Sequence, residues 1–206
     1  MNWRLSRIGA TLLVLGFLNA GCGGDVPRLP RLAAGDVIVA FGDSLTFGTG
    51  AAEHESYPAV LSKLIKRPVV RAGVPGEVTE QGLRRLPAVI DEYQPRLVIV
   101  CLGGNDMLRK VAPSLIKRNL AAILDELRGR GIAAVLVGVP KPALLTSAAD
   151  FYAELAGEFQ VPYEGEVVTD VLYSPEMKSD PIHPNAKGYR RMAEALARLL
   201  REAGAV

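Results

Sequence analysis

Residues 36–48 read DVIVAFGDSLTFG, and this stretch decides the fold. Its first half, Asp36 to Phe41, is short, rich in β-branched residues and followed by Gly42. That pattern is typical of a buried central strand of a parallel sheet rather than of a helix. In open α/β folds, ligands bind beyond the carboxyl ends of such strands, so the hydroxyl of Ser44 stands where chemistry usually occurs. Taken alone, residues 42–44 could equally be a turn in which Asp43 or Ser44 caps a helix.

The composition is that of one ordinary globular domain. The chain has 206 residues, of which 49% are hydrophobic and 22% charged, and this length can bury a sizeable core. We place the domain at residues 35–206. Only two cysteines occur, Cys22 and Cys101. We therefore expect no structural disulfide and interpret Cys101, which lies in an apolar run, as a small core residue.

The amino terminus has the pattern of a secretory signal peptide. Arg4 and Arg7 precede the apolar run 8–18 and the small residues Ala20 and Gly21, so we assign residues 1–21 to the signal. The run is too short to span a bilayer as a helix, which needs about 20 residues. Removal of both arginines leaves 22 basic and 22 acidic side chains, and this balance gives no reason to expect a nucleic-acid partner.

The end of this signal, LNAGC at residues 18–22, resembles the lipobox of bacterial lipoproteins. The resemblance implies that Cys22 is lipidated and anchors the protein to a membrane, and Gly23 after it implies the outer membrane. The alternative is an ordinary cleaved signal with an incidental cysteine. Residues 22–34, with prolines and little periodicity, are predicted to be a tether. We therefore expect an exported lipoprotein that faces the periplasm.

Strands and helices alternate along the rest of the chain, which predicts an α/β/α sandwich with a parallel sheet of about five strands. The predicted strands are residues 36–41, 68–71, 96–102, 132–139 and 161–163. The predicted helices are residues 56–66, 79–93, 113–130, 148–159 and 184–203. Ser56 and Thr79 are expected to be N-caps, Pro87 predicts a kink or an early break, and residues 167–180 are expected to be mostly loop.

Polar residues that can carry out acyl transfer follow several of these strands. His183 comes three residues after Asp180, a spacing that lets the carboxylate reach imidazole Nδ1 and leaves Nε2 to take a proton from Ser44. Gly76 and Asn105 could donate hydrogen bonds to an oxyanion, together with the N–H of Ser44. Each of these residues has an ordinary structural alternative as a turn or a helix cap.

Two further residues are given supporting or surface positions. Asp106 is interpreted as a buried acceptor that holds its loop. His54, in a polar loop beside two glutamates, is expected to be a solvated surface residue. With a single His–carboxylate pair and no further cluster, the sequence disfavours a metal site.

Four motifs together resemble the sequence blocks of the GDSL, or SGNH, hydrolase superfamily. They are Gly-Asp-Ser-Leu at 42–45, Gly76 in its glycine turn, Gly-Gly-Asn-Asp at 103–106 and Asp-Pro-Ile-His at 180–183. Residues 81–87, 94–96 and 102–109 are similar to the bacterial arylesterase, acyl-CoA thioesterase and lysophospholipase branch. The resemblance implies the flavodoxin-like SGNH fold.

The same resemblance implies roles for five residues. Ser44 would be the nucleophile, His183 the general base and then acid, and Asp180 the residue that orients it. Ser44, Gly76 and Asn105 would form the oxyanion hole. The chain departs from the family pattern at Arg71 and at residues 75–78, which leaves the acyl-chain preference open.

The expected function is hydrolysis of aryl or acyl esters, thioesters or lysophospholipids through an acyl-Ser44 intermediate, without a metal or other cofactor. Two alternatives stay open: a carbohydrate O-acetylesterase of the cell envelope, and a lipoprotein that uses the fold only to bind. Apolar residues near the site could contact an acyl chain or belong to the core. They are Leu45, Phe47, Val74, Met107, Leu108, Leu144 and Leu145.

Overall fold

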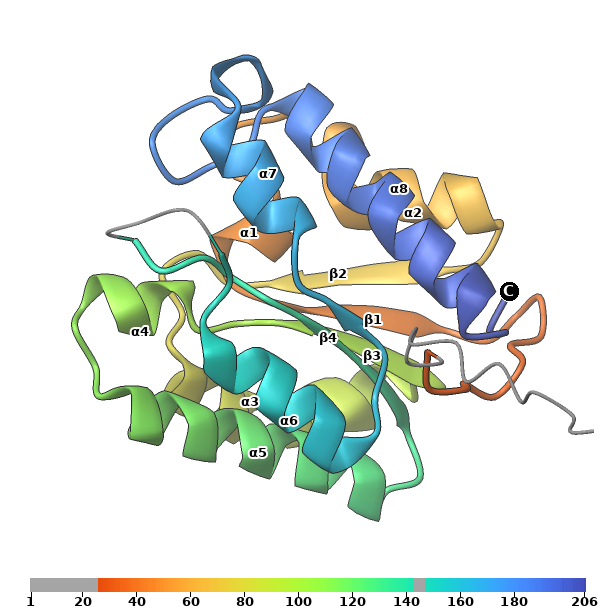
Figure 1. Cartoon of the computed structure of the whole chain (residues 1–206). Coiled ribbons are helices and arrows are strands. Elements are labelled where there is room, and N and C mark those ends of the chain that lie inside the picture. The colour runs from red at the N-terminus through yellow and green to blue at the C-terminus, as the bar shows by residue number, and fades with distance from the viewer. Residues whose placement is uncertain (1–25, 143–146) are drawn as a thin grey trace, which may run out of the picture.

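A parallel five-stranded sheet with the strand order β2-β1-β3-β4-β5 forms the middle layer of the molecule (Figure 1). The computed structural model describes residues 26–142 and 147–206. The strands are β1 (Ile38–Gly42), β2 (Val69–Gly73), β3 (Leu97–Cys101), β4 (Ala133–Val137) and β5 (Tyr163–Glu164). As predicted, the strand that leads to Ser44 is an interior strand, and β5 is an edge strand.

Helices cover both faces of this sheet, which confirms the predicted three-layer α/β/α sandwich (Figure 1). On one side lie α2 (Tyr57–Ile65), α7 (Val167–Tyr173) and α8 (Ala186–Glu202). On the other side lie α3 (Thr79–Tyr93), α5 (Pro113–Gly129) and α6 (Asp150–Phe159). Two short helices, α1 (Ser44–Phe47) and α4 (Gly104–Leu108), begin just after β1 and β3, and single 3-10 turns occur at Glu53–Glu55 and Pro175–Met177.

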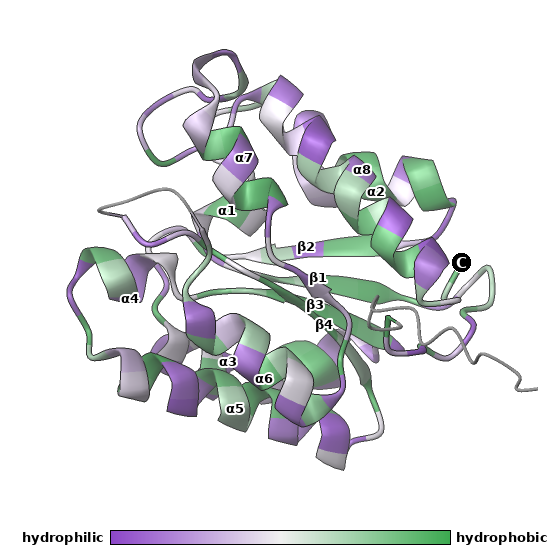
Figure 2. Cartoon of the chain, viewed as in Figure 1, coloured by the Kyte–Doolittle hydropathy of each residue, from purple (hydrophilic) through white to green (hydrophobic). Residues whose placement is uncertain are grey.

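The core is centred on β1 and β3, whose residues are all buried. Because both faces of the sheet are covered, these strands are continuously apolar rather than alternating (Figure 2). Cys101 lies among them as a free, buried thiol, in agreement with its interpretation as a core residue. Among the described residues, no helix is both long and apolar enough to cross a membrane.

Several local expectations need correction. Residues 167–173 form α7 rather than loop, and α8 begins after the N-cap Asn185 rather than at Pro184. The N-cap of α3 is Val78, while the side chain of Thr79 turns inward to Asp106. Helix α3 continues through Pro87 to Tyr93, so the early break does not occur.

The described part of the predicted tether packs onto the domain. The N–H groups of Leu29 and Leu32 donate to the carbonyls of Ala203 and Ala205, both at 2.9 Å. The Leu32 side chain is only 2% exposed. Residues 26–34 are therefore docked beside the carboxyl end of α8. The predicted signal peptide, residues 1–21, and Cys22 lie outside the described residues.

Candidate active site

Ser44 begins α1 directly after β1, at the carboxyl edge of the sheet. Asp43 is the N-cap, and its Oδ1 accepts a hydrogen bond of 3.0 Å from the N–H of Leu45. Residues 42–44 are therefore both a helix-capping turn and the segment that positions Ser44 at the edge of the sheet. Only glycine fits at position 42, because a Cβ there would lie 2.3 Å from the carbonyl oxygen of Cys101 on β3.

A chain of hydrogen bonds joins Ser44 to His183 and Asp180. His183 Nε2 lies 3.0 Å from Ser44 Oγ, and His183 Nδ1 lies 2.7 Å from Asp180 Oδ2. An ionised carboxylate can only accept, so Nδ1 carries the proton and Nε2 of the neutral ring is free to accept from the serine hydroxyl. The structure thus brings these three predicted residues into one relay.

Asp180 is fixed by the backbone of its own turn. Its Oδ1 accepts from the N–H groups of Ile182 and His183, each at 2.9 Å. Slight desolvation raises the pKa of Asp180, but these two N–H groups and His183 outweigh it and lower the pKa below the usual value of 3.8. The carboxylate is therefore ionised at neutral pH and suited to orient the imidazole.

The loop that carries His183 is held by Asn185, a residue that our sequence analysis did not single out. Asn185 Nδ2 donates to the carbonyls of Glu176 and Lys178 at 2.9 and 3.2 Å, and its Oδ1 caps α8. Beside it, the hydroxyl of Tyr189 donates to the carbonyl of Thr49 at 2.7 Å and ties α8 to the loop after α1. An Asn immediately before a helical run is a capping signal that could have revealed this position.

Asn105 lies beside Ser44 and lines the same cavity. Its Nδ2 donates to Asp43 Oδ2 at 3.2 Å and to the carbonyl of Glu77 at 3.1 Å, so both amide N–H groups are held between these two acceptors. Gly76, with φ of +79°, forms the turn just before Glu77. Gly76 is not one of the described residues that line the cavity. It is connected to the site through the next residue, Glu77, whose carbonyl accepts a hydrogen bond from Asn105.

Glu77 belongs to an ion pair that the sequence did not reveal. Arg85 on α3 donates from Nε and Nη2 to the two carboxylate oxygens of Glu77 at 2.7 and 2.6 Å, and the Glu77 side chain is 5% exposed. Arg85 Nη2 also donates to the carbonyl of Ala72 at 3.1 Å, and the guanidinium lies 4.2 Å from the centre of the Phe41 ring. The pair therefore fastens the turn at Gly76 to the ends of β1 and β2.

Two buried carboxyl groups lie behind the site. Burial raises the pKa of Asp43 from 3.8 to about 7, and Glu77 and Asp106 add to the rise while the Leu45 N–H and Asn105 oppose it. Asp106 accepts from Thr79 N and Thr79 Oγ1 at 2.9 and 2.6 Å. Asn119 on α5 donates to the same threonine hydroxyl at 3.1 Å. Asp106 thus holds its loop as a buried acceptor, as predicted.

The cavity next to Ser44 has mostly apolar walls. Leu45 and Leu108, two of the predicted wall residues, lie in its lining. Phe47 instead lies under the guanidinium of Arg71, and Leu144 and Leu145 are outside the described residues. The apolar part of the lining consists of Leu45, Leu108, Val139, Pro140, Pro142, Leu172 and Ile182. The described residues contain no group of three or more His, Cys, Asp or Glu side chains that could hold a metal ion. His54 is an exposed surface residue, as its polar loop predicted.

A parallel α/β sandwich with a Ser–His–Asp relay at the carboxyl edge of its sheet defines the class of α/β serine hydrolases. Comparison with known proteins makes this class specific. The model of the GDSL-like Lipase/Acylhydrolase family matches residues 40–191, which is most of the chain. The protein belongs to this family.

Its similarity to individual family members extends over most of their length. The chain is 34% identical over 178 residues to "Thioesterase 1/protease 1/lysophospholipase L1" of Escherichia coli, covering 82% of this chain and 86% of the relative. It is 31% identical over 179 residues to "Esterase TesA" of Pseudomonas aeruginosa, covering 81% and 88%.

Solved structures show the same fold. The structure of AlinE4, an SGNH-hydrolase family esterase, has a TM-score of 0.64 and 33% identity, covering 84% of this chain and 98% of that one. A crystal structure of TesA has a TM-score of 0.72 and 26% identity, covering 82% and 99%. The expected superfamily and its fold are thereby confirmed.

Proposed function

We propose that the protein is a serine esterase that hydrolyses carboxylic esters through an acyl-Ser44 intermediate. The observation that carries this proposal is the continuous relay from Ser44 Oγ through His183 to Asp180. His183 Nε2 takes the serine proton as Oγ attacks the ester carbonyl, and the imidazolium then protonates the leaving alcohol. Water then attacks the acyl group and gives a proton to His183 Nε2, and the imidazolium passes that proton to Ser44 Oγ as the acid leaves. Asp180 stabilises the imidazolium at each stage.

The tetrahedral oxyanion would be bound by the N–H of Ser44, the N–H of Gly76 and the amide of Asn105. Asn105 Nδ2 donates to Asp43 Oδ2 at 3.2 Å and to the Glu77 carbonyl at 3.1 Å, which fixes its side chain before substrate arrives. These two bonds use both N–H groups of the amide, so Asn105 would bind the oxyanion by exchanging the longer bond, to Asp43, for one to the substrate oxygen. Its position beside Ser44 in the cavity lining supports this role.

The apolar cavity beside Ser44 supports an acyl group as the part of the substrate that is bound. The name of the Escherichia coli relative includes thioesterase and lysophospholipase, and it supports acyl esters, thioesters and lysophospholipids as the substrate class. The leaving group would depart toward solvent past His183.

The first test is hydrolysis of p-nitrophenyl esters, from acetate to palmitate, by the wild type and the Ser44→Ala variant. We expect turnover by the wild type and none above background by Ser44→Ala, whereas Ser114→Ala on the exposed surface of α5 should match the wild type. Full activity in Ser44→Ala would contradict the mechanism. Activity confined to acetyl esters would favour the carbohydrate O-acetylesterase over the long-chain esterase, and no activity on any ester would favour the binding lipoprotein.

We further propose that the protein is exported and anchored through a lipid on Cys22. The support is the sequence alone: the basic start, the apolar run 8–18 and the motif at 18–22. The intact mass of the mature amino terminus tests this. A chain that begins at acylated Cys22 is expected, and an unmodified amino terminus at any other residue would contradict the anchor.

A further inference from the structure

The outer surface formed by α2, its C-cap Lys66 and α8 carries an excess of positive charge. On α8 the cationic residues at 187, 190, 191, 198 and 201 fall on one side of the helix and form a stripe that Glu194 interrupts near its middle. Among the charged residues of this surface, seven are basic and two are acidic. The basic ones are Lys63, Lys66, Lys187, Arg190, Arg191, Arg198 and Arg201, and the acidic ones are Glu194 and Glu202. We call this surface the α2–α8 face.

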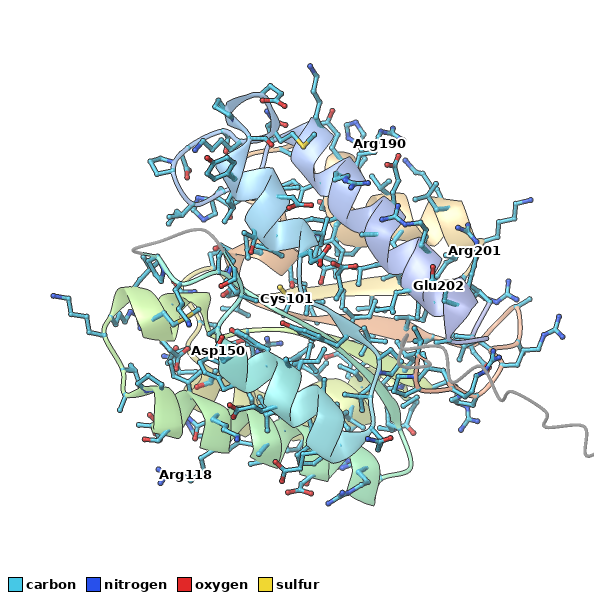
Figure 3. The ribbon with its side chains drawn as sticks, in the orientation of Figure 1. Cys101, Arg118, Asp150, Arg190, Arg201 and Glu202 are labelled. Atoms are coloured by element: carbon cyan, nitrogen blue, oxygen red, sulfur yellow. The ribbon has the colours of Figure 1, made fainter. Side chains whose placement is uncertain are left out.

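The cations of this face differ from those on the opposite side of the sheet. Within the described residues, none of the seven takes part in an ion pair. On the other side, Arg84 and Arg85 of α3, Lys117, Arg128 and Arg130 near α5 are all paired with carboxylates. Figure 3 shows Arg190 and Arg201 along α8 and Arg118 on the far side of the molecule. Of the cations on α3 and α5, only Arg118 lacks an ion pair in the described part of the chain, whereas all seven on the α2–α8 face lack one.

Helix α8 connects two functional parts of the molecule. Its amino end follows the loop that bears His183. A groove between α2 and α8 lies there, and its charged lining consists of four basic and two acidic residues: Lys63, Lys187, Arg190, Arg191, Glu55 and Glu194. The carboxyl end of α8 receives the docked residues 26–34 through the Ala203 and Ala205 carbonyls. With 17 residues, α8 spans about 25 Å. A flat partner lying along α8 would touch the surface beside the site at one end and the amino-terminal segment at the other.

We infer that the α2–α8 face binds the surface of an anionic phospholipid bilayer. Lipid phosphates supply the complementary charge over the length of the stripe, and basic side chains close to an anionic leaflet each add to the attraction. Nucleic acid fits less well, because none of the exposed large hydrophobic residues described in the structure lies on α2 or α8 to stack with bases. The inference goes beyond ester hydrolysis and does not depend on it.

This orientation has a consequence for the proposed anchor. Cys22 stands four residues before Val26, the first residue of the docked segment. Insertion of a lipid at Cys22 would hold the carboxyl end of α8 close to the bilayer, and the cationic stripe would then bring the whole helix down onto it. The mouth of the site would be at the rim of the contact, within reach of lipid esters.

Co-sedimentation with vesicles tests the inference on the unacylated chain from residue 23 onward, since residues 26–142 and 147–206 make every contact described for the fold. Vesicles of phosphatidylcholine alone are compared with vesicles that contain about 30% phosphatidylglycerol. We expect binding to the anionic vesicles only, and weaker binding as added salt screens the charges. Arg190→Gln combined with Arg198→Gln should lower the partition coefficient by about 25-fold, taking about fivefold for each cation.

The matched control removes two exposed arginines from the other side, with Arg84→Gln combined with Arg118→Gln. Net charge is then equal in the two double variants, and the control should bind vesicles as the wild type does. A second test pair, Lys63→Gln with Lys187→Gln, should lose binding as well. Unchanged turnover of a soluble aryl ester by each variant verifies its fold.

Two results would overturn the inference. Equal loss of binding in the test and control variants would mean that net charge alone attracts the protein to the vesicles. Equal binding of the wild type to anionic and neutral vesicles, or no binding to either, would exclude recognition of net negative lipid charge. Neither result would affect the proposed ester hydrolysis, because turnover of the soluble aryl ester measures that activity separately.

Discussion

Asp43 lies next to Ser44 in the chain and accepts a hydrogen bond from Asn105, and its burial makes the stability of the protein depend on pH. The carboxyl group is 2% exposed, and its pKa in the folded protein is raised from 3.8 to about 7. Between these values the folded protein retains a proton that the unfolded chain has released. The free energy of unfolding therefore falls as the pH rises from about 4 to about 7, and it levels off above 7.

We predict that Asp43→Asn reduces this pH dependence. A shift of this size corresponds to about 4 kcal/mol between the two ends of the window. Urea denaturation at several pH values would show a smaller fall in the variant than in the wild type. Asp180 does not interfere, because its lowered pKa makes its contribution disappear only as the pH falls below its ordinary 3.8. Parallel stability curves for the two proteins would contradict the prediction.

At the scale of secondary-structure elements, the Glu77–Arg85 pair joins α3 to the ends of β1 and β2. We predict that Arg85→Met lowers kcat with little change in KM, because the Glu77 carbonyl that holds Asn105 would lose its support. The loss should stay below the factor of about 10²–10³ that removal of an oxyanion donor costs. An unpaired buried carboxylate should also destabilise the fold by about 3 kcal/mol.

Helix α3 provides the control for this experiment. Arg84, the preceding residue, forms an exposed pair with Glu80, so Arg84→Met should change neither kcat nor stability by a measurable amount. Adding Glu77→Gln to Arg85→Met removes the unpaired charge and should recover part of the stability without recovering kcat. Recovery of kcat together with stability would mean that the pair acts only on folding.

A second pair of variants compares two buried threonines. Thr79 bridges α3, α4 and α5 through Asp106 and Asn119, so Thr79→Val should lower the free energy of unfolding by about 1–3 kcal/mol. Thr169 on α7 has a buried hydroxyl without a hydrogen-bond partner in the described part of the chain. Thr169→Val should therefore be neutral or stabilising. Chemical denaturation of the two variants checks the difference, and equal losses would contradict it.

The same elements show what the sequence could and could not predict. The spacing of Asp180 and His183 and the strand before Ser44 made the relay possible, and the four motifs occurring together made it predictable, because each alone could be a turn or a helix cap. Thr79 was misinterpreted because its partner, Asp106, is 27 residues away. Helix α7 was missed because its Val-rich sequence has low helix propensity, and packing against α8 together with capping by Glu164 Oε1 overrides that preference.

At the scale of the whole molecule, the docked residues 26–34 determine at which residue the cooperative folding unit begins. Its prolines and lack of periodicity indicated a tether, and the contact is revealed only by the burial of Leu32 and the hydrogen bonds of Leu29 and Leu32 to the end of the chain. We predict that Leu32→Ala lowers the free energy of unfolding by about 2–3 kcal/mol. The neighbouring Arg31→Ala, on an exposed side chain, should have little effect. If urea denaturation gave the same midpoint for both variants, residues 26–34 would not belong to the folding unit.

The hydrogen bond between Ser44 and His183 joins positions that are 139 residues apart, and all of β2, β3, β4 and β5 lies between them. A chain that emerges amino end first thus exposes its serine long before the histidine that activates it has appeared. Contacts of such long range form late in folding, because the intervening loop must be closed first. Partly made chains would therefore be inert toward esters, and reactivity would begin only when the protein closes on itself.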